Sequence, residues 1–282
     1  MKSNVSILNK GKEMSRSGII TLLTDFGLSD AYTSMMKGVI LSINRNIRLV
    51  DVTHCVAVGS IFQGAGILKE TFSYFPDGTV HVAVVDPGVG STRRAMALKA
   101  AGHFFVGPDN GIFWPIIKDN KDAEIIELSE KKYFMPHVTS TFHGRDIFAP
   151  AAAHISLGIE IGQLGLPLTD PEELTLPQPY QKDDILKGEI TRIDNFGNLI
   201  TNITSEDIIR FLGNEKPVIH LCDYEIIGIS ETYSDREKGE LLALINSTNH
   251  LEVAVNLGKA SEYLKKESDR IIGTRVKVFR LN

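Results

Sequence analysis

The sequence is poor in cysteine and has no segment long and apolar enough to cross a membrane. Cys55 and Cys222 are the only two cysteines among 282 residues, and neither belongs to a CxxC or Cys–His pair. This spacing argues against a zinc ribbon and against a secreted disulfide scaffold. No apolar run approaches the ~20 residues of a membrane-spanning helix, and the polar N-terminus lacks the apolar core of a signal peptide. We therefore expect a soluble, cytoplasmic protein that does not insert into membranes.

The sequence also lacks an excess of positive charge and the common nucleotide motifs. Thirty Lys and Arg stand against 35 Asp and Glu, a net charge of -5 at pH 7, so no electrostatic footprint for nucleic acid is visible. The segment 86–94, DPGVGSTRR, has neither the GK[ST] of a phosphate loop nor GxGxxG. By itself, the pair Arg93 and Arg94 fits a solvated turn with surface ion pairs. The GxSxG elbow of serine hydrolases is absent as well.

What the sequence does contain, from residue 18 to residue 165, is the pattern of an α/β domain. Short apolar or β-branched runs followed by turn residues predict buried strands. These runs are residues 19–24, 47–50, 80–85 and 103–107. The segments 31–44 and 60–75 have helical length and spacing, which predicts two βαβ units with parallel strands. The segment 95–107 is too short for a crossover helix and predicts a hairpin, so the sheet should be mixed.

Four further segments complete the predicted organisation. A helix is expected at 147–158, with a proline in its first turn. Residues 1–17 are interpreted as a loose polar tail, and 166–186, which is rich in proline, as a linker. Residues 187–282 contain β-rich runs without crossover helices and predict a smaller all-β, barrel-like domain. The expected fold class is therefore α/β, a Rossmann-like mixed-sheet domain followed by that barrel.

Polar side chains follow the predicted strands, where ligands of open α/β sheets bind. They are Asp25, Asp51, His54, Asp86, Asp109 and Asn110. Each alone fits a turn or cap residue, whereas together three carboxylates would form an acidic crevice suited to a metal, a ribose diol or a cationic ligand. A metal site from Asp25, Asp86, Asp109 and His143 is chemically possible, but it lacks the close helical spacing of a specific motif.

Three other segments gather polar residues. In STFHGRD, residues 140–146, His143 is a candidate general base, or a structural histidine. In DNFGNLITN, Asp194 and Asn198 fit an Asx turn, or the recognition of an ammonium group by a carboxylate and an amide. The loop 245–256 adds Ser247, Glu252 and Asn256, which are able to recognise the edge of a heterocycle. Composition and spacing alone do not name a reaction.

Seven motifs taken together, in order, resemble the S-adenosylmethionine (SAM) hydrolase family, which is related to the SAM-dependent fluorinases and chlorinases. They are TDFGLSDAY, MKGVI, VDPGVGSTRR, GPDNG, STFHGRDIFAPAAA, DNFGNLITNI and INS…LEVAVN. The resemblance runs from Ile19 to the C-terminus. It implies hydrolysis of SAM to adenosine and L-methionine, by attack of an activated water on the ribose C5′, without a metal or a cofactor.

The resemblance also implies roles for individual residues. Asp86, Arg93 and His143 would hold and activate the water, and Asp25 would bind the ribose hydroxyls. Asp194 and Asn198 would hold the methionine part, and the loop with Ser247, Glu252 and Val255 would contact the adenine. The family is typically trimeric, so a homotrimer with its sites between subunits is expected.

Three alternatives and two departures accompany this resemblance. Halogenating relatives carry Tyr and Thr where this chain has Asp86 and Val89, and fluorinases carry a halide-binding Ser at the position of Gly144, which favours the hydrolase over a halogenase-like transferase. The other two alternatives are a SAM- or adenosine-binding protein with little turnover and a metal-dependent hydrolase. The chain departs from the family at Val58 and Gly59, and at LGKAS after the VAVN segment.

Overall fold

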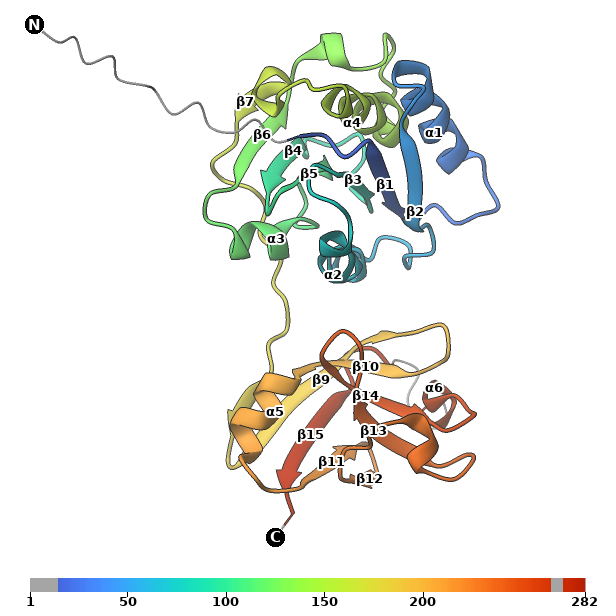
Figure 1. The fold of residues 1–282 in the computed structure, drawn as a ribbon, viewed down its shortest axis with the longest axis vertical. Coiled ribbons are helices and arrows are strands. Elements are labelled where there is room, and N and C mark those ends of the chain that lie inside the picture. Colours follow the sequence, from blue (N-terminus) through green and yellow to red (C-terminus); the bar gives the residue numbers. More distant parts are fainter. Residues whose placement is uncertain (1–14, 265–270, 282) are drawn as a thin grey trace, which may run out of the picture. The chain divides into compact units, whose positions relative to one another are not determined.

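The computed structural model describes residues 15–264 and 271–281. The chain divides into two compact units, Met1–Leu174 and Thr175–Asn282 (Figure 1). None of the helices in the described ranges is long and apolar enough to cross a membrane.

The first unit is built on a seven-stranded mixed sheet with the order β2-β1-β3-β5-β4-β6-β7. Its strands are β1 (Ile19–Thr24), β2 (Arg48–Thr53), β3 (Val80–Val84), β4 (Ala95–Ala100), β5 (His103–Pro108), β6 (Glu124–Leu128) and β7 (Gly165–Pro167). β1 is parallel to β2 and β3, and β3 is parallel to β5. β4 and β5 form an antiparallel hairpin. The predicted parallel strands, hairpin and mixed sheet are all confirmed.

Helices cover both faces of this sheet (Figure 1). They are α1 (Tyr32–Ile43), α2 (Ile61–Thr71), α3 (Trp114–Asp119) and α4 (Ala149–Ser156), with a π turn at Gly144–Phe148 and 3-10 turns at Phe72–Tyr74, Lys131–Tyr133 and Ile161–Gln163. Met36 of α1 and Ala152 of α4 belong to the core on one face, whereas Leu68 of α2 and Ile116 of α3 belong to the core on the other. Pro150 lies in the first turn of α4 as predicted.

The end of the expected polar tail is not loose. The Nε of Arg16 donates to the carbonyl of Ile155 at 2.9 Å, and its guanidinium lies 4.1 Å from the centroid of the Phe104 ring. Ser17 shares a hydrogen bond of 2.9 Å with Thr79. A single arginine in a polar stretch has no periodicity, so the sequence gives no sign that it packs. Residues 1–14 of that tail lie outside the described residues.

The segment 166–186 contributes structure to both units. Leu168 is buried, and Leu174 packs against the core beneath α2 and α3. After the division at 174/175, β8 (Tyr180–Lys182) pairs with β9 (Ile185–Ile193) of the second unit.

The second unit is an antiparallel, barrel-like sheet of eight strands, which confirms the predicted class. The order is β12-β11-β15-β9-β10-β14-β13, with β8 beside β9. The remaining strands are β10 (Leu199–Thr204), β11 (Pro217–Leu221), β12 (Tyr224–Ile227), β13 (Leu241–Ile245), β14 (His250–Val255) and β15 (Arg275–Arg280). A 3-10 turn lies at Tyr233–Asp235.

Among the described residues of this unit, which was expected to be all-β, two helices interrupt the β-structure. They are α5 (Ser205–Leu212) and α6 (Ala260–Leu264). Thr204 caps α5 by accepting from the backbone N–H of Asp207, whose carboxylate accepts from the N–H of Thr204 in return. A threonine followed three residues later by an acidic residue is a capping-box signal, so the sequence contained the evidence for α5.

Candidate functional site

The loop between β3 and β4 brings Asp86 and Arg93 together in a bidentate ion pair. The Nε of Arg93 donates to Oδ1 of Asp86 at 3.0 Å, and its Nη2 contacts Oδ2. The two side chains are only 5% and 9% exposed. A planar guanidinium that meets both oxygens of a carboxylate fixes the orientation of both groups. Arg93 is therefore not the solvated turn residue that its position next to Arg94 indicates.

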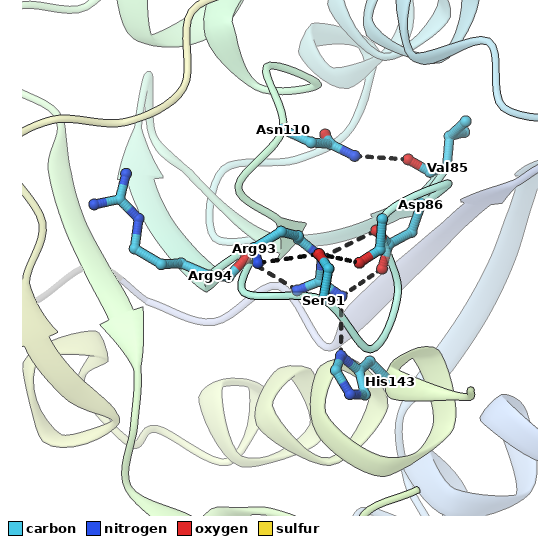
Figure 2. Close-up of polar contacts among 8 residues, drawn as sticks. Val85, Asp86, Ser91, Arg93, Arg94, Asn110 and His143 are labelled. Carbon is cyan, nitrogen blue, oxygen red and sulfur yellow. Dashed lines mark hydrogen bonds and ion pairs between the residues drawn. The ribbon is translucent and has the colours of Figure 1, made fainter. Parts of the chain in front are cut away.

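His143 completes the group from a distant part of the chain (Figure 2). It lies directly before the π turn, an unusual winding often found at functional sites. The Nη2 of Arg93 also approaches Nδ1 of His143, at 2.9 Å. Because a guanidinium only donates, Nδ1 must accept, and the proton of the neutral imidazole is assigned to Nε2.

The surroundings of His143 favour this neutral form. Burial lowers its pKa below the usual value, and the positive charge of Arg93 lowers it further, against the opposing influence of Asp86 and Asp146. Asp146 is itself held by Arg145, through an Nε–Oδ1 contact of 2.6 Å. The imidazole therefore stays uncharged at a pH where an exposed histidine begins to take up a proton.

A cavity of about 150 Å³ adjoins Asp86 and His143. Its wall includes Phe26, Tyr32 and Phe142, whose ring centroids lie 5.2–5.9 Å apart. This space is small beside the ~300–1,000 Å³ of pockets that enclose a drug-sized ligand. It has room for a small reacting group, and Asp86 and His143 share its lining with the three aromatic rings.

Gly144 gives this cavity little space for a larger residue. A Cβ added there would lie 3.2 Å from the Sδ of Met36 and 3.3 Å from a ring carbon of Phe142. Both separations are tighter than ordinary van der Waals contact, so a serine would have to displace its neighbours.

Asp25 lies at the same edge of the sheet as Asp86. β1 and β3 pair in parallel, so the residues that follow them emerge together. The Oδ2 of Asp25 accepts the backbone N–H of Gly59 at 2.8 Å, and Gly59 has a φ of +72°, a conformation that favours glycine. At the two positions where the chain departs from the family, Gly59 thus orients the Asp25 carboxylate, whereas Val58 is 90% exposed.

The other strand-end carboxylates do not combine into the acidic crevice that the sequence suggested. Asp51 contacts Lys37 at 2.6 Å and His54 at 3.1 Å. Asp109 contacts Arg94 at 2.7 Å. Each of these charges has its own cationic partner. In the ranges that the structure describes, no three His, Cys, Asp or Glu side chains are grouped to hold a metal ion, so Asp25, Asp86, Asp109 and His143 do not form the candidate metal site.

In the second unit, Asp194 organises the loop between β9 and β10. Its Oδ1 accepts the backbone N–H groups of Phe196 and Asn198 at 2.9 and 2.8 Å, and its Oδ2 accepts the Asn198 side-chain amide at 3.0 Å. This is the Asx turn, one of the two alternatives that the motif predicted. The side chains also face cavities: Asp194 lines one of about 470 Å³, and Asn198 lines one of about 610 Å³.

The predicted adenine-contacting residues line the same two cavities. Ser247 and Glu252 belong to the smaller and Val255 to the larger. Glu252 is buried, and it accepts hydrogen bonds from the Tyr233 hydroxyl at 2.8 Å and from the Asn246 amide at 3.2 Å. Burial raises the pKa of Glu252 and, together with the bond to Glu252, raises that of Tyr233 to about 12.

Sequence reasoning missed two residues that line both cavities, Phe196 and Tyr233. Phe196 is 73% exposed within the DNFGN motif, and an exposed aromatic side chain at a turn was an available signal. Tyr233 lies in a 3-10 turn of a polar stretch, where no pattern distinguishes it.

The comparisons with known proteins find similarity over nearly the whole chain. Residues 20–165 match the model of the SAM hydroxide adenosyltransferase N-terminal domain, and residues 188–272 match that of the C-terminal domain. An (R)-S-adenosyl-L-methionine hydrolase of Salinispora tropica is 36% identical over 253 residues, which cover 87% of this chain and 93% of the relative. One of Methanocaldococcus jannaschii is 34% identical over 262 residues, with 87% and 91% covered.

More distant relatives and solved structures extend this similarity. A fluorinase of an Actinoplanes species is 27% identical over 270 residues, covering 84% of this chain and 91% of the relative. The crystal structure of an uncharacterized conserved protein from Thermotoga maritima superposes with a TM-score of 0.85 at 33% identity, covering 93% of this chain and all of that one.

Proposed function

Since the chain belongs to the SAM hydroxide adenosyltransferase family, we propose that it hydrolyses SAM to adenosine and L-methionine. The observation that carries the proposal is the contact of Arg93 with both Asp86 and His143 at the edge of a small, aromatic-walled cavity. These are the three residues that the family motifs assign to water activation.

The proposed reaction is a displacement at the ribose C5′. The oxygen of water forms the new bond to C5′, the C5′–S bond breaks, and its electron pair returns to sulfur. Because the leaving group is a neutral thioether departing from a sulfonium cation, no acid is needed to protonate it. The protein must hold water, C5′ and sulfur in line and remove a proton from the water.

The geometry supports separate roles for the three side chains. Arg93 occupies the Nδ1 side of His143, so the Nε2–H is left to donate to the water oxygen. The carboxylate of Asp86 has lone pairs beyond those that face Arg93 and accepts the proton of the water. The guanidinium stabilises the negative charge that develops on the attacking oxygen.

Two features favour water over a halide as the nucleophile. Asp86 would place a negative charge beside an incoming anion, at a cost of about 1–4 kcal/mol at 4 Å. A serine at Gly144, as fluorinases carry there, would have to displace Met36 and Phe142. Val89 also lines the cavity with an apolar group.

The first test is incubation of the purified protein with SAM, followed by chromatography and mass detection of products. We expect adenosine and methionine in equal amounts, unaffected by EDTA or by chloride. Loss of activity with EDTA would favour the metal-dependent alternative, and 5′-chloro-5′-deoxyadenosine would favour the halogenase. Binding of SAM without products would make the protein a SAM-binding protein.

For the substrate contacts we propose the assignments of the family motifs. Asp25, held by Gly59, would accept from the ribose hydroxyls. Asp194 and Asn198 would face the methionine part, and Ser247, Glu252 and Val255 the adenine. The support is their exposure to the two cavities of the second unit and, for Asp25, its position at the sheet edge beside Asp86.

We further propose a cytoplasmic homotrimer in which each site combines the first unit of one subunit with the second unit of its neighbour. Co-expression of Asp86→Ala with Asp194→Ala chains in equal amounts tests this, because about 25% of all sites in randomly assembled trimers would then carry both native residues. We expect the mixture to recover about 25% of the native activity, and we expect light scattering to give the mass of a trimer. An inactive mixture of correctly folded chains would contradict the shared site.

A further inference from the structure

The turn after β5, residues 108–111, holds the loop 86–93 at both of its ends. Asn110 acts at the first end: its Nδ2 donates to the carbonyl of Val85 at 2.9 Å (Figure 2). The Oδ1 of Asn110 accepts the backbone N–H of Ile112 at 3.3 Å, which fixes the orientation of the amide. The peptide bond that leads into Asp86 is therefore anchored by a side chain from a neighbouring strand end.

Asp109 acts at the second end. Its carboxylate, 1% exposed, accepts from the Nε of Arg94 at 2.8 Å. Its backbone N–H donates to the carbonyl of Arg94 at 3.0 Å, and that same carbonyl accepts from Nη1 of Arg93 at 3.0 Å. Asp109 thus holds Arg94 through both its backbone N–H and its carboxylate, and the carbonyl of Arg94 orients the guanidinium of Arg93 beside His143. Its other oxygen accepts the N–H of Glu172 at 2.8 Å.

From these contacts we infer that Asp109 and Asn110 are positioning residues, which set the geometry of Asp86 and Arg93 without touching the substrate. The inference rests on the proposed function. The loop between the two anchors contains Gly88 and Gly90, and glycine leaves the backbone much conformational freedom. Without the anchors, Asp86 and Arg93 would sample more arrangements, and a misplacement of 1 Å at a reacting group costs about 10²-fold in rate.

The variant Asp109→Asn keeps an acceptor for Glu172 but places an amide nitrogen against Arg94. We expect kcat to fall about tenfold to a hundredfold, with KM for SAM changed less than about threefold. Asn110→Ala tests the other anchor and should give the same pattern. The matched control is Asp170→Asn, which also contacts Arg94, at 2.8 Å, but through a side chain that is 79% exposed. It should leave both constants unchanged.

A second readout does not depend on turnover. NMR titration of the His143 imidazole reports where Arg93 lies, because Arg93 lowers the pKa of His143 whereas Asp86 and Asp146 raise it. In Asp109→Asn, a displaced Arg93 should let this pKa rise toward its ordinary value of 6.5. Unchanged kcat, KM and His143 titration in both folded variants would overturn the inference. A shifted titration in a protein whose native form does not hydrolyse SAM would instead overturn the proposed function.

Discussion

Replacement of Asp86 by asparagine is expected to lower kcat for SAM hydrolysis by about 10²–10⁴-fold, the usual contribution of a general base. The amide cannot accept the proton of the attacking water, and it leaves Arg93 without its buried counter-charge. The affinity for SAM, measured by calorimetry, should change little, because the predicted binding contacts lie elsewhere. Asp119→Asn, which neutralises an exposed carboxylate paired with Lys69 at 2.5 Å, is the matched control and should retain full activity.

His143→Ala provides an independent test of the same group. It removes the Nε2–H that we propose orients the water, and it removes the Nδ1 acceptor of Arg93, so kcat should fall about 10²-fold or more. His143→Gln, which restores a side-chain amide of similar reach, should recover part of that loss. If Asp86→Asn and His143→Ala both turned over SAM at the native rate, the water-activating role of this group would be wrong.

The fold could be predicted from the sequence wherever one local pattern decides the structure. The apolar runs predicted β1, β2, β3 and β5 of the first sheet, and the shortness of 95–107 predicted the hairpin of β4 and β5, whereas β6 and β7 were not predicted. The helix α5 was missed because the β-rich runs around it decided the prediction, and the capping box at Thr204 and Asp207 was not considered. Arg16 was missed because its partners, among them Ile155 and Phe104, lie far away in sequence.

The site was less accessible than the fold, for a physical reason. Asp86 and His143 were candidates from position and residue type, but 57 positions separate them, and spacing alone does not indicate that Arg93 contacts both. Only the family motifs linked them in advance. Asp109 was a candidate site residue because a carboxylate at a strand end looks the same in sequence whether it faces a ligand or, as here, pairs with an arginine, Arg94, while itself buried.

A second large effect is expected on stability in acid. His81 and His103 are 0% and 3% exposed in the core of the first unit. The Nδ1 of His81 lies 2.8 Å from the Thr21 hydroxyl, and its Nε2 lies 3.2 Å from Nδ1 of His103. Burial lowers the pKa of His81 to about 3, helped by the charge of His103, and burial lowers the pKa of His103 as well.

The sign of the pH dependence follows from these lowered values. Below pH 6.5 the unfolded chain takes up protons that the folded chain does not, until the pH approaches the folded pKa of His81 at about 3. The stability is therefore fully present above pH 6.5 and is lost as the pH falls. A single such group contributes about 1.4 kcal/mol for each pH unit, or about 3 kcal/mol by pH 4.5.

Urea unfolding between pH 7.5 and pH 4.5 measures this loss for the first unit alone, because Trp114, the single tryptophan, lies in α3 and reports on that unit. His81→Gln keeps a polar partner for Thr21 but cannot titrate. It should be less stable than the native chain at pH 7.5 and should lose less stability on acidification, by about 2–3 kcal/mol. His220→Gln, at a half-exposed site of the second unit, should follow the native curve.

Equal acid slopes for the native and His81→Gln chains would mean that other groups, such as Asp51 and Asp146, dominate the response. Those carboxylates also have lowered pKa values, but they lose their stabilisation only as the pH falls toward and below 4. The pH at which the native and His81→Gln curves separate therefore distinguishes the two sources.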